Sequence, residues 1–366
     1  MRIAFYDPRS GGHKPALIRG LVATAIELGH EPIVIGAHVD DLPTETTTIP
    51  FTYSNSFVYP FQARQLYKLC AQQRLDLFVD LTFDNSVWGF SRRLRQVARG
   101  QVHVVHKTRV FNLEGRSVQG KAMARYLRFK ARRLIASGSA FVVHKQATQK
   151  AFGDIVGAKN VLALNYPTAP VAADFQTSDV AVPFILWVGR ERPDKGLEPF
   201  LRGFFRTTIN AELKIVGHQP SHIVELVNAQ ADDRVHLLNN YTNPIKLAEL
   251  YASSSLVAVP YPEAMRNGGG ASGVLLDALT HGKPVVVTPP VAELLPSDFA
   301  GMVIAKDNAP TNLAIAIESA LERLPQLSAI AKVAGPHYIE TEHRFTDYLS
   351  GIIALAGSHH SDPQSG

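Results

Sequence analysis

The sequence predicts an α/β protein made of two doubly wound domains, and three observations support this prediction. Short apolar runs typical of strands alternate with segments whose apolar residues recur at helical spacing, which is the pattern of a parallel sheet with helices on both faces. A stretch rich in proline, alanine and polar residues, 166–183, interrupts the alternation, which then restarts. With 366 residues and 46% hydrophobic content, the chain is long enough for two cores.

Each expected strand is a short apolar run bounded by glycine, proline or polar residues. These runs are 2–7, 32–37, 75–82, 101–106, 140–144 and 160–165 in the first half, and 184–189, 212–217, 234–238, 256–260, 284–288 and 301–305 in the second. Helical spacing of apolar residues predicts the helices between them, at 13–31, 91–99, 121–138, 197–207, 244–254, 273–282 and 312–324.

The predicted domain boundaries follow from these elements. They are an N-terminal domain over 1–168, a linker over 169–183, a C-terminal domain over 184–335, a separate helix over 336–357 that begins after Gly335 and crosses back to the first domain, and a disordered tail over 358–366. Ligands of such sheets bind at the carboxyl ends of the strands, and two facing domains create a cleft.

Composition narrows the class of protein. The chain has one cysteine, Cys70, so no internal disulfide forms and we expect a reducing, cytoplasmic compartment. The N-terminal stretch is interrupted by proline and glycine and is not expected to be a signal peptide, and no apolar run is long enough to span a membrane. No cysteine or histidine cluster has metal-ligand spacing, so we expect no metal and no other cofactor.

The charge of the chain is unevenly distributed. The net charge is +5, but residues 91–134 hold 13 lysines or arginines and one acid, Glu114, which leaves the rest of the chain negative. Within this segment 121–138 is a basic amphipathic helix with Met123, Leu127 and Leu134 on one side. Such a surface predicts an anionic partner, for which a membrane is the candidate. The simpler interpretation is a charged helix face that contacts only solvent. We recognise no nucleic-acid-binding module in the sequence.

A glycine-rich turn leads from the strand at 256–260 into the helix at 273–282. Free backbone N–H groups at a helix N-terminus bind anions, and glycines let the backbone approach a ligand closely. Asp277 lies one turn inside the helix and leans back toward the turn, where a carboxylate suits sugar or ribose hydroxyls. The other interpretation is a flexible turn with a solvent-facing acid. The candidate binding residues are Gly269, Gly270, Ala271, Ser272, Gly273, Val274 and Asp277.

Two cations follow the strand at 184–189. Arg190 comes directly after Gly189, and Lys195 follows a Pro-Asp turn in the same loop. Two cations at the carboxyl end of a strand suit a diphosphate. The simpler interpretation is a pair of solvated loop cations.

Three ordered motifs carry a family resemblance. The segments "VGRERPDKG" (188–196), "IVGHQP" (215–220) and "PYPEAMRNGGGASGVLLDALTHGKPVV" (260–286) resemble the "VGR…KG", "VGxGP" and "PSxxEGFGxxxLEAMAxGxPVV" motifs of GT-B glycosyltransferases of the retaining family-4 type (glycosyltransferases group 1). The N-terminal segment 10–36 resembles the opening Gly-Gly loop of the same family. The resemblance covers most of the chain and implies two Rossmann-like domains, an acceptor domain followed by a nucleotide-sugar domain.

The resemblance also implies residue roles. Arg190 and Lys195 would bind the donor diphosphate, and Asp277 falls where the family has its second, ribose-binding Glu. Gly269 stands where the family has its first Glu, so backbone amides, Ser272 or Glu263 must serve that position.

Further candidates lie at other strand ends. His106, in "VVHKTR", matches a family histidine near the acceptor and donor sugar; taken alone, it is as well explained as a structural residue. Additional donor-binding candidates are Gly11, Gly12, His13, Gly189, Gly217 and Tyr241. Of these, His13 and Tyr241 are also consistent with ordinary surface residues.

We therefore expect a metal-independent, retaining glycosyltransferase that moves a sugar from a nucleotide-diphospho-sugar to a glycan or lipid-linked acceptor. We expect it to act in surface polysaccharide or glycolipid biosynthesis, at the inner face of a membrane. The alternatives are a nucleotide-sugar epimerase or hydrolase on the same fold, and a non-catalytic sugar-binding partner.

Overall fold

In the computed structural model the chain forms two compact units, and each is described by itself. The first runs from Met1 to Thr168 and includes the C-terminal segment from His343, and the second holds Ala169–Arg266 and Ser272–Glu342. The structure describes residues 1–8, 14–36, 39–51, 59–83, 96–106, 111, 113, 117–157, 160–169, 182–238, 243–263 and 272–358.

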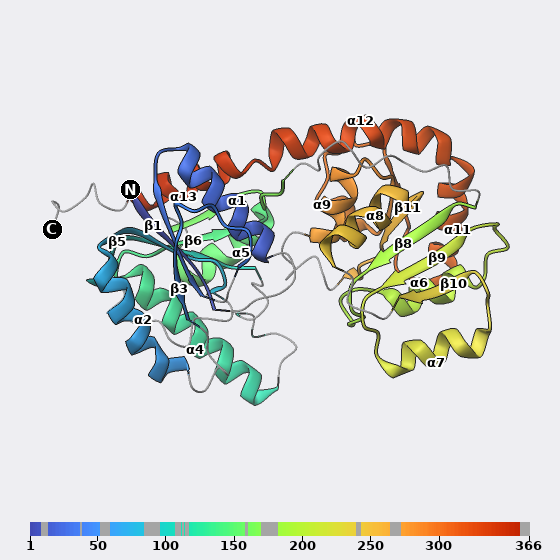
Figure 1. Ribbon diagram of the computed structural model, residues 1–366. Helices are drawn as coiled ribbons and strands as arrows, with labels where there is room; N and C mark the ends of the chain where they lie inside the picture. Colours follow the sequence, from blue (N-terminus) through green and yellow to red (C-terminus); the bar gives the residue numbers. More distant parts are fainter. Residues whose placement is uncertain are drawn as a thin grey trace. The chain divides into compact units, whose positions relative to one another are not determined.

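The first unit is built on a seven-stranded parallel sheet in the order β3-β2-β1-β4-β5-β6-β7 (Figure 1). Its strands are β1 (Arg2–Asp7), β2 (Glu31–Gly36), β3 (Thr47–Pro50), β4 (Leu75–Asp80), β5 (Ala98–Val104), β6 (Ala140–Val143) and β7 (Val161–Ala163). Its helices are α1 (Lys14–Glu27), α2 (Tyr59–Gln73), α4 (Val118–Ile135), α5 (Gln146–Val156) and α13 (Phe345–Gly357). The strand β5 begins at Ala98, inside the stretch predicted as the helix 91–99.

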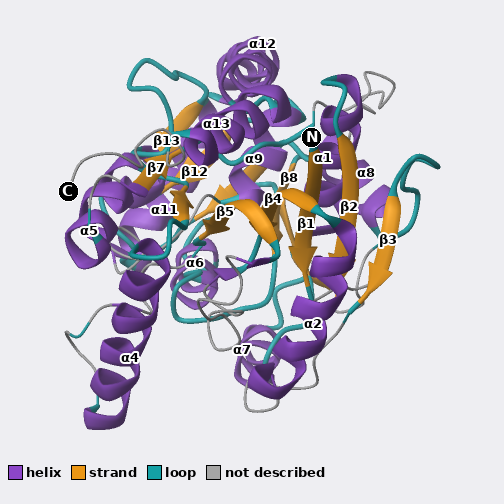
Figure 2. Ribbon diagram, turned by 90° about the vertical axis from the view of Figure 1, so that its left-hand side faces the viewer, coloured by secondary structure: helices purple, strands orange, loops and turns teal. Residues whose placement is uncertain are grey.

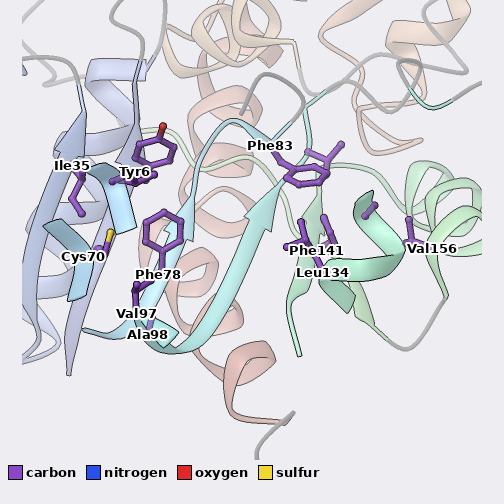
Figure 3. Packing of buried hydrophobic residues seen from close by; sticks show 14 of the residues in the cluster. Tyr6, Ile35, Cys70, Phe78, Phe83, Val97, Ala98, Leu134, Phe141 and Val156 are labelled. Carbon is purple, nitrogen blue, oxygen red and sulfur yellow. The ribbon is translucent and has the colours of Figure 1, made fainter. Parts of the chain in front are cut away.

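Helices cover both faces of the first sheet. On one face α2, α4 and α5 pack over a cluster that includes Phe78, Phe141 and Cys70 (Figure 3). On the other face α1 and α13 pack together, and Gly20 of α1 lies so close to the Phe345 ring that a Cβ there would overlap it. The C-terminal helix therefore belongs to the core of the first unit, as predicted.

The second unit is built on a six-stranded parallel sheet in the order β10-β9-β8-β11-β12-β13. Its strands are β8 (Phe184–Val188), β9 (Glu212–Val216), β10 (Val235–Leu238), β11 (Leu256–Val259), β12 (Val285–Val287) and β13 (Met302–Ile304). Its helices are α6 (Leu197–Phe204), α7 (Ser221–Gln230), α8 (Pro244–Ser253), α9 (Gly273–Thr280), α10 (Pro289–Ala292), α11 (Pro310–Glu322) and α12 (Leu324–Glu342). The helices α6, α7 and α11 cover one face, and α9 packs against β11 and α12.

The strand orders place a switch point in each unit. The chain winds one way from β1 and the other way from β4, and in the same manner from β8 and β11, so the carboxyl ends of these neighbouring strands form the natural binding position of each sheet. The predicted fold class, two doubly wound parallel-sheet units, is confirmed (Figure 1).

The predicted start of a separate helix after Gly335 is not observed. Gly335 and Pro336 lie inside α12 rather than between two helices. A Cβ at Gly335 would lie 2.6 Å from the Leu279 carbonyl oxygen, so this glycine permits α12 to lie close against α9. None of the described helices is both long enough and apolar enough to cross a membrane.

Cys70 provides a test of the first core. It is fully buried on α2, and burial raises the pKa of its thiol to about 12. Because the thiolate is the reactive form, we expect no reaction of the native protein with a thiol reagent such as DTNB at pH 8, and one reacting thiol per chain in guanidinium. The absorbance of the released thiolate measures this, with Cys70→Ala as the blank. Rapid stoichiometric reaction under native conditions contradicts the burial of α2.

Candidate functional site

The loops after β8 and β11 meet at the switch point of the second unit. Gly196 has a φ of +74°, and a Cβ on it would overlap the Pro260 carbonyl oxygen. The same oxygen accepts a hydrogen bond from the Asn308 side chain at 2.7 Å. The sequence places glycine where two loops approach most closely, and this contact fixes the position of Lys195, the residue before it.

Lys195 is half-buried and lies against Tyr261, which follows Pro260 at the end of β11. The ammonium nitrogen is 2.5 Å from the Tyr261 hydroxyl oxygen and 4.0 Å from the centroid of the ring. Ser272 Oγ lies 3.2 Å from the same hydroxyl and also accepts from the backbone N–H of Leu275, so it caps α9. Lys195 is thereby held beside the N-terminus of α9.

Arg190 and its neighbours form the other side of this loop. Arg190 is exposed. Gln219 donates to the carbonyl oxygens of Gly189 at 2.7 Å and Gly217 at 2.8 Å and accepts from the N–H of Glu191 at 3.0 Å. The structure therefore brings the predicted residues Gly189 and Gly217 together at adjacent strand ends. Gln219 was not predicted, although it lies two residues after Gly217 in the quoted motif "IVGHQP".

Glu191 is a second residue that sequence reasoning missed. Its carboxylate accepts from the N–H of Leu197 at 3.0 Å and so satisfies the first turn of α6. Burial raises the pKa of this carboxyl. Its role is to shape the loop that carries both cations.

Asp277 is half-buried on α9, beside Tyr251 of α8. Burial, followed by the charge of the Asp277 carboxylate, raises the pKa of the Tyr251 hydroxyl well above its ordinary value. The Tyr251 ring stacks on His281 with centroids 5.2 Å apart. Asp277 is thus not a simple solvent-facing acid. Among the other predicted helix residues, the Val274 side chain is buried, so only its backbone is available to a ligand.

In the first unit His106 follows β5. Its Nε2 is 2.7 Å from the Leu81 carbonyl oxygen, at the carboxyl end of β4, and donates there. The turn that presents this carbonyl is fixed by Asp80, which accepts from the N–H of Thr82 at 3.0 Å and pairs with the fully buried His103 at 3.2 Å. His106 therefore lies at the strand ends where a ligand is expected.

His144 is a neighbour of His106 that was not predicted. The two rings are 5.0 Å apart, and His144 also lies edge-on to Tyr166 at 5.1 Å. Burial, followed by the charge of His106, lowers the pKa of His144 well below its ordinary value. The sequence did carry a signal, because "VVHK" occurs at both 104–107 and 142–145.

The remaining predicted residues, Gly11, Gly12, His13, Tyr241, Gly269, Gly270 and Ala271, lie outside the described residues. Within the described ranges, no group of three or more His, Cys, Asp or Glu side chains is arranged to hold a metal ion.

Comparisons with known proteins support the fold. Residues 182–323 match the family model of the glycosyl transferases group 1. No curated protein matches the chain significantly. Among solved structures, Anabaena HepE in complex with UDP has a TM-score of 0.70 at 16% identity, covering 97% of this chain and 100% of HepE. Sucrose-phosphate synthase from Thermosynechococcus elongatus has a TM-score of 0.75 at 16% identity, covering 98% and 99%.

A further neighbour is WaaG, a glycosyltransferase involved in lipopolysaccharide biosynthesis, with a TM-score of 0.67 at 16% identity over 97% of this chain and 100% of WaaG. At these identities the likeness establishes the GT-B fold. The family model and the neighbours together support a glycosyltransferase, whereas retention, the acceptor and the replacement of the first Glu by Gly269 stay predictions.

Replacement of Asp277 tests the ribose assignment. Asp277→Asn keeps the shape and an oxygen for Tyr251 but removes the charge, so we expect affinity for a nucleoside diphosphate to fall roughly tenfold, the scale of one charge-assisted hydrogen bond. Isothermal titration with UDP, GDP, ADP and dTDP measures this. The exposed Asp298→Asn in the same unit is the control. Unaltered affinity with altered thermal stability would assign Asp277 a structural role.

Proposed function

We propose that the protein is a glycosyltransferase whose second unit binds a nucleotide-diphospho-sugar. The observation that carries the proposal is the convergence of Lys195, the N-terminus of α9 and the half-buried Asp277 at the carboxyl ends of β8 and β11. A cation and free backbone N–H groups suit a diphosphate, and a carboxylate suits ribose. The structures of HepE with UDP and with UDP-glucose add support for this donor class.

Each residue has a role in this proposal. Lys195 and the exposed Arg190 stabilise the negative charge that develops on the leaving diphosphate. His106, in the first unit, is assigned to the acceptor. No residue is assigned as a nucleophile: the acceptor hydroxyl attacks from the face that the diphosphate leaves, the leaving diphosphate helps to take the acceptor proton, and the sugar retains its configuration. No metal is required.

The rival functions predict different product distributions. A nucleotide-sugar hydrolase or epimerase consumes or converts the donor without an acceptor, whereas a transferase does so slowly. A non-catalytic partner, which Gly269 in place of an acid would favour, binds the donor and converts none of it. Incubation with UDP-, GDP-, ADP- and dTDP-sugars, with and without an acceptor extract, followed by chromatography that resolves epimers and by mass spectrometry, distinguishes the three.

The two cations test the transferase assignment. We expect Arg190→Ala and Lys195→Ala each to reduce turnover roughly a hundredfold, the scale for losing one preorganised charge stabiliser. Arg192→Ala is the matched control, because Arg192 lies in the same loop but pairs with Asp194 at 3.1 Å. Initial rates of nucleoside diphosphate release provide the measurement. Wild-type turnover in both site variants would end the assignment.

We also propose that the acceptor is lipid-linked, a precursor of a surface polysaccharide or glycolipid, and that the protein reaches it by peripheral binding to the inner face of an anionic membrane. The supporting observation is the exposed face of α4, which carries Val118, Met123, Tyr126 and Phe129, of which Val118 is 85% and Phe129 53% exposed. In Figure 2, α4 extends beyond the strands that it packs against. No acid occurs between Val118 and Ile135.

The structure corrects which residues form this face. Leu127 and Leu134, predicted to share a side with Met123, are buried in the core of the first unit. Helical spacing alone did not distinguish the packed face from the exposed one. Arg128 and Arg132 donate to the carbonyl oxygens of Phe111 and Ile155, each at 2.7 Å, and so tether the helix.

Three further cations of α4, Lys121, Arg125 and Arg133, are exposed. Arg133 lies over the Phe129 ring at 5.3 Å from its centroid. Aromatic rings interleaved with arginines fit the boundary between lipid headgroups and acyl chains.

Liposome flotation tests membrane binding. At about 1 kcal/mol per cation, changing Lys121, Arg125 and Arg133 to Gln should weaken binding to anionic liposomes roughly a hundredfold at low salt. High salt should weaken binding of the wild type, because exposed charges are screened. Tyr126→Ser with Phe129→Ser should reduce binding at both salt concentrations, since these rings act through apolar contact.

The control removes three exposed cations from the second unit by changing Lys246, Lys306 and Arg323 to Gln. Equal flotation of the wild type with neutral and anionic liposomes, or flotation with neither, would contradict the proposal and favour a soluble acceptor.

A further inference from the structure

Tyr261 is the residue on which Lys195 rests. It directly follows Pro260, its side chain is 2% exposed, and its hydroxyl oxygen lies between Lys195 Nζ at 2.5 Å and Ser272 Oγ at 3.2 Å. Its hydroxyl joins the loop after β8 to the first turn of α9.

The backbone of Tyr261 is fixed on both sides. Its N–H donates to the Val259 carbonyl oxygen at 3.0 Å, and its own carbonyl oxygen accepts from the Thr288 hydroxyl at the end of β12. The carbonyl of Pro260 is held by Asn308 at 2.7 Å and packs on Gly196. A ring on so fixed a backbone, buried on all sides, is a rigid support.

A lysine side chain needs such a support. Its four-carbon stem has many rotamers, and ordering it when a ligand binds costs free energy. In a preorganised site this entropy is lost on folding, so it does not reduce the affinity for the ligand. The Tyr261 ring attracts the ammonium through its face, and the hydroxyl accepts from it directly. Because this partner is neutral, and no described carboxylate pairs with Lys195, the positive charge stays available for an anion.

We propose that Tyr261 is a positioning residue: it holds the Lys195 ammonium beside the N-terminus of α9, oriented for the phosphate oxygens of a nucleoside diphosphate. This inference rests on the proposed function of the site. The hydroxyl accepts from both Lys195 and Ser272. Because Tyr261 acts through Lys195, its effect is on the phosphates of the donor, and the base and ribose are untouched.

The test compares diphosphates with monophosphates. Isothermal titration gives the Kd of UDP, GDP, ADP and dTDP and of UMP, GMP, AMP and dTMP for the wild type and for Tyr261→Phe, which keeps the ring but loses the hydroxyl. For the nucleotide pair that the wild type binds best, we expect the diphosphate to lose affinity roughly tenfold and the monophosphate to lose much less. Tyr261→Leu, which also loses the ring, should weaken the diphosphate further.

A double-mutant cycle with Lys195→Ala shows whether Tyr261 acts through the lysine. We expect Tyr261→Phe to have no additional effect on diphosphate affinity once Lys195 is absent. Tyr338→Phe is the control, because the Tyr338 hydroxyl donates to the Leu294 carbonyl oxygen at 3.3 Å elsewhere in the same unit. Its nucleotide affinities should equal those of the wild type.

The outcomes separate the two levels of inference. If the wild type binds none of the diphosphates, the proposed function fails. If it binds one and Lys195→Ala weakens binding while Tyr261→Phe does not, the positioning role alone is overturned. Equal losses for diphosphate and monophosphate in Tyr261→Phe, or an undiminished loss in the Lys195→Ala background, likewise overturn it, since a merely structural tyrosine gives those results.

Discussion

The close approach of Gly196 to the Pro260 carbonyl oxygen is the constraint on which the second-unit site depends. Any side chain at position 196 would force the loop after β8 away from the end of β11, and the left-handed backbone there favours glycine. With the two loops in contact, Lys195 on one side and Tyr261 on the other are neighbours by necessity. Asn308 binds the same carbonyl oxygen and brings the end of β13 into the arrangement.

Most strands and the loops that form the second-unit site could be predicted from the sequence, because they depend on local patterns. Parallel strands end at one edge of a sheet, so Gly189, Arg190 and Lys195 after one strand and the turn before α9 after another were expected to face the same ligand. Apolar runs and their glycine or proline boundaries located most strands for the same reason. The pairing of β8 with β11 then brings the loops that follow these two strands next to each other.

What could not be predicted depends on partners distant in the chain. Tyr251 lies beside Asp277 of another helix, whose charge helps to raise the pKa of the Tyr251 hydroxyl. Gln219 binds the carbonyl oxygens of two strand ends that only the folded sheet brings together. Periodicity placed Met123, Leu127 and Leu134 on one side of α4, although only the two leucines pack in the core and Met123 is exposed. A separate helix was expected to begin at Pro336, after Gly335, but α12 runs through both residues. The close packing of Gly335 on α9 accompanies a helix that continues through that position.

The burial of Cys70 makes the chain convenient for spectroscopy. A protein with one unreactive thiol has no background labelling, so any cysteine introduced on an exposed position becomes a unique attachment point for a fluorophore or spin label. One such position in each unit, for example Lys150 on α5 and Lys306 after β13, would form a donor–acceptor pair. Energy transfer between them would then follow the distance between the units as nucleotides and acceptors are added, without removal of the native cysteine.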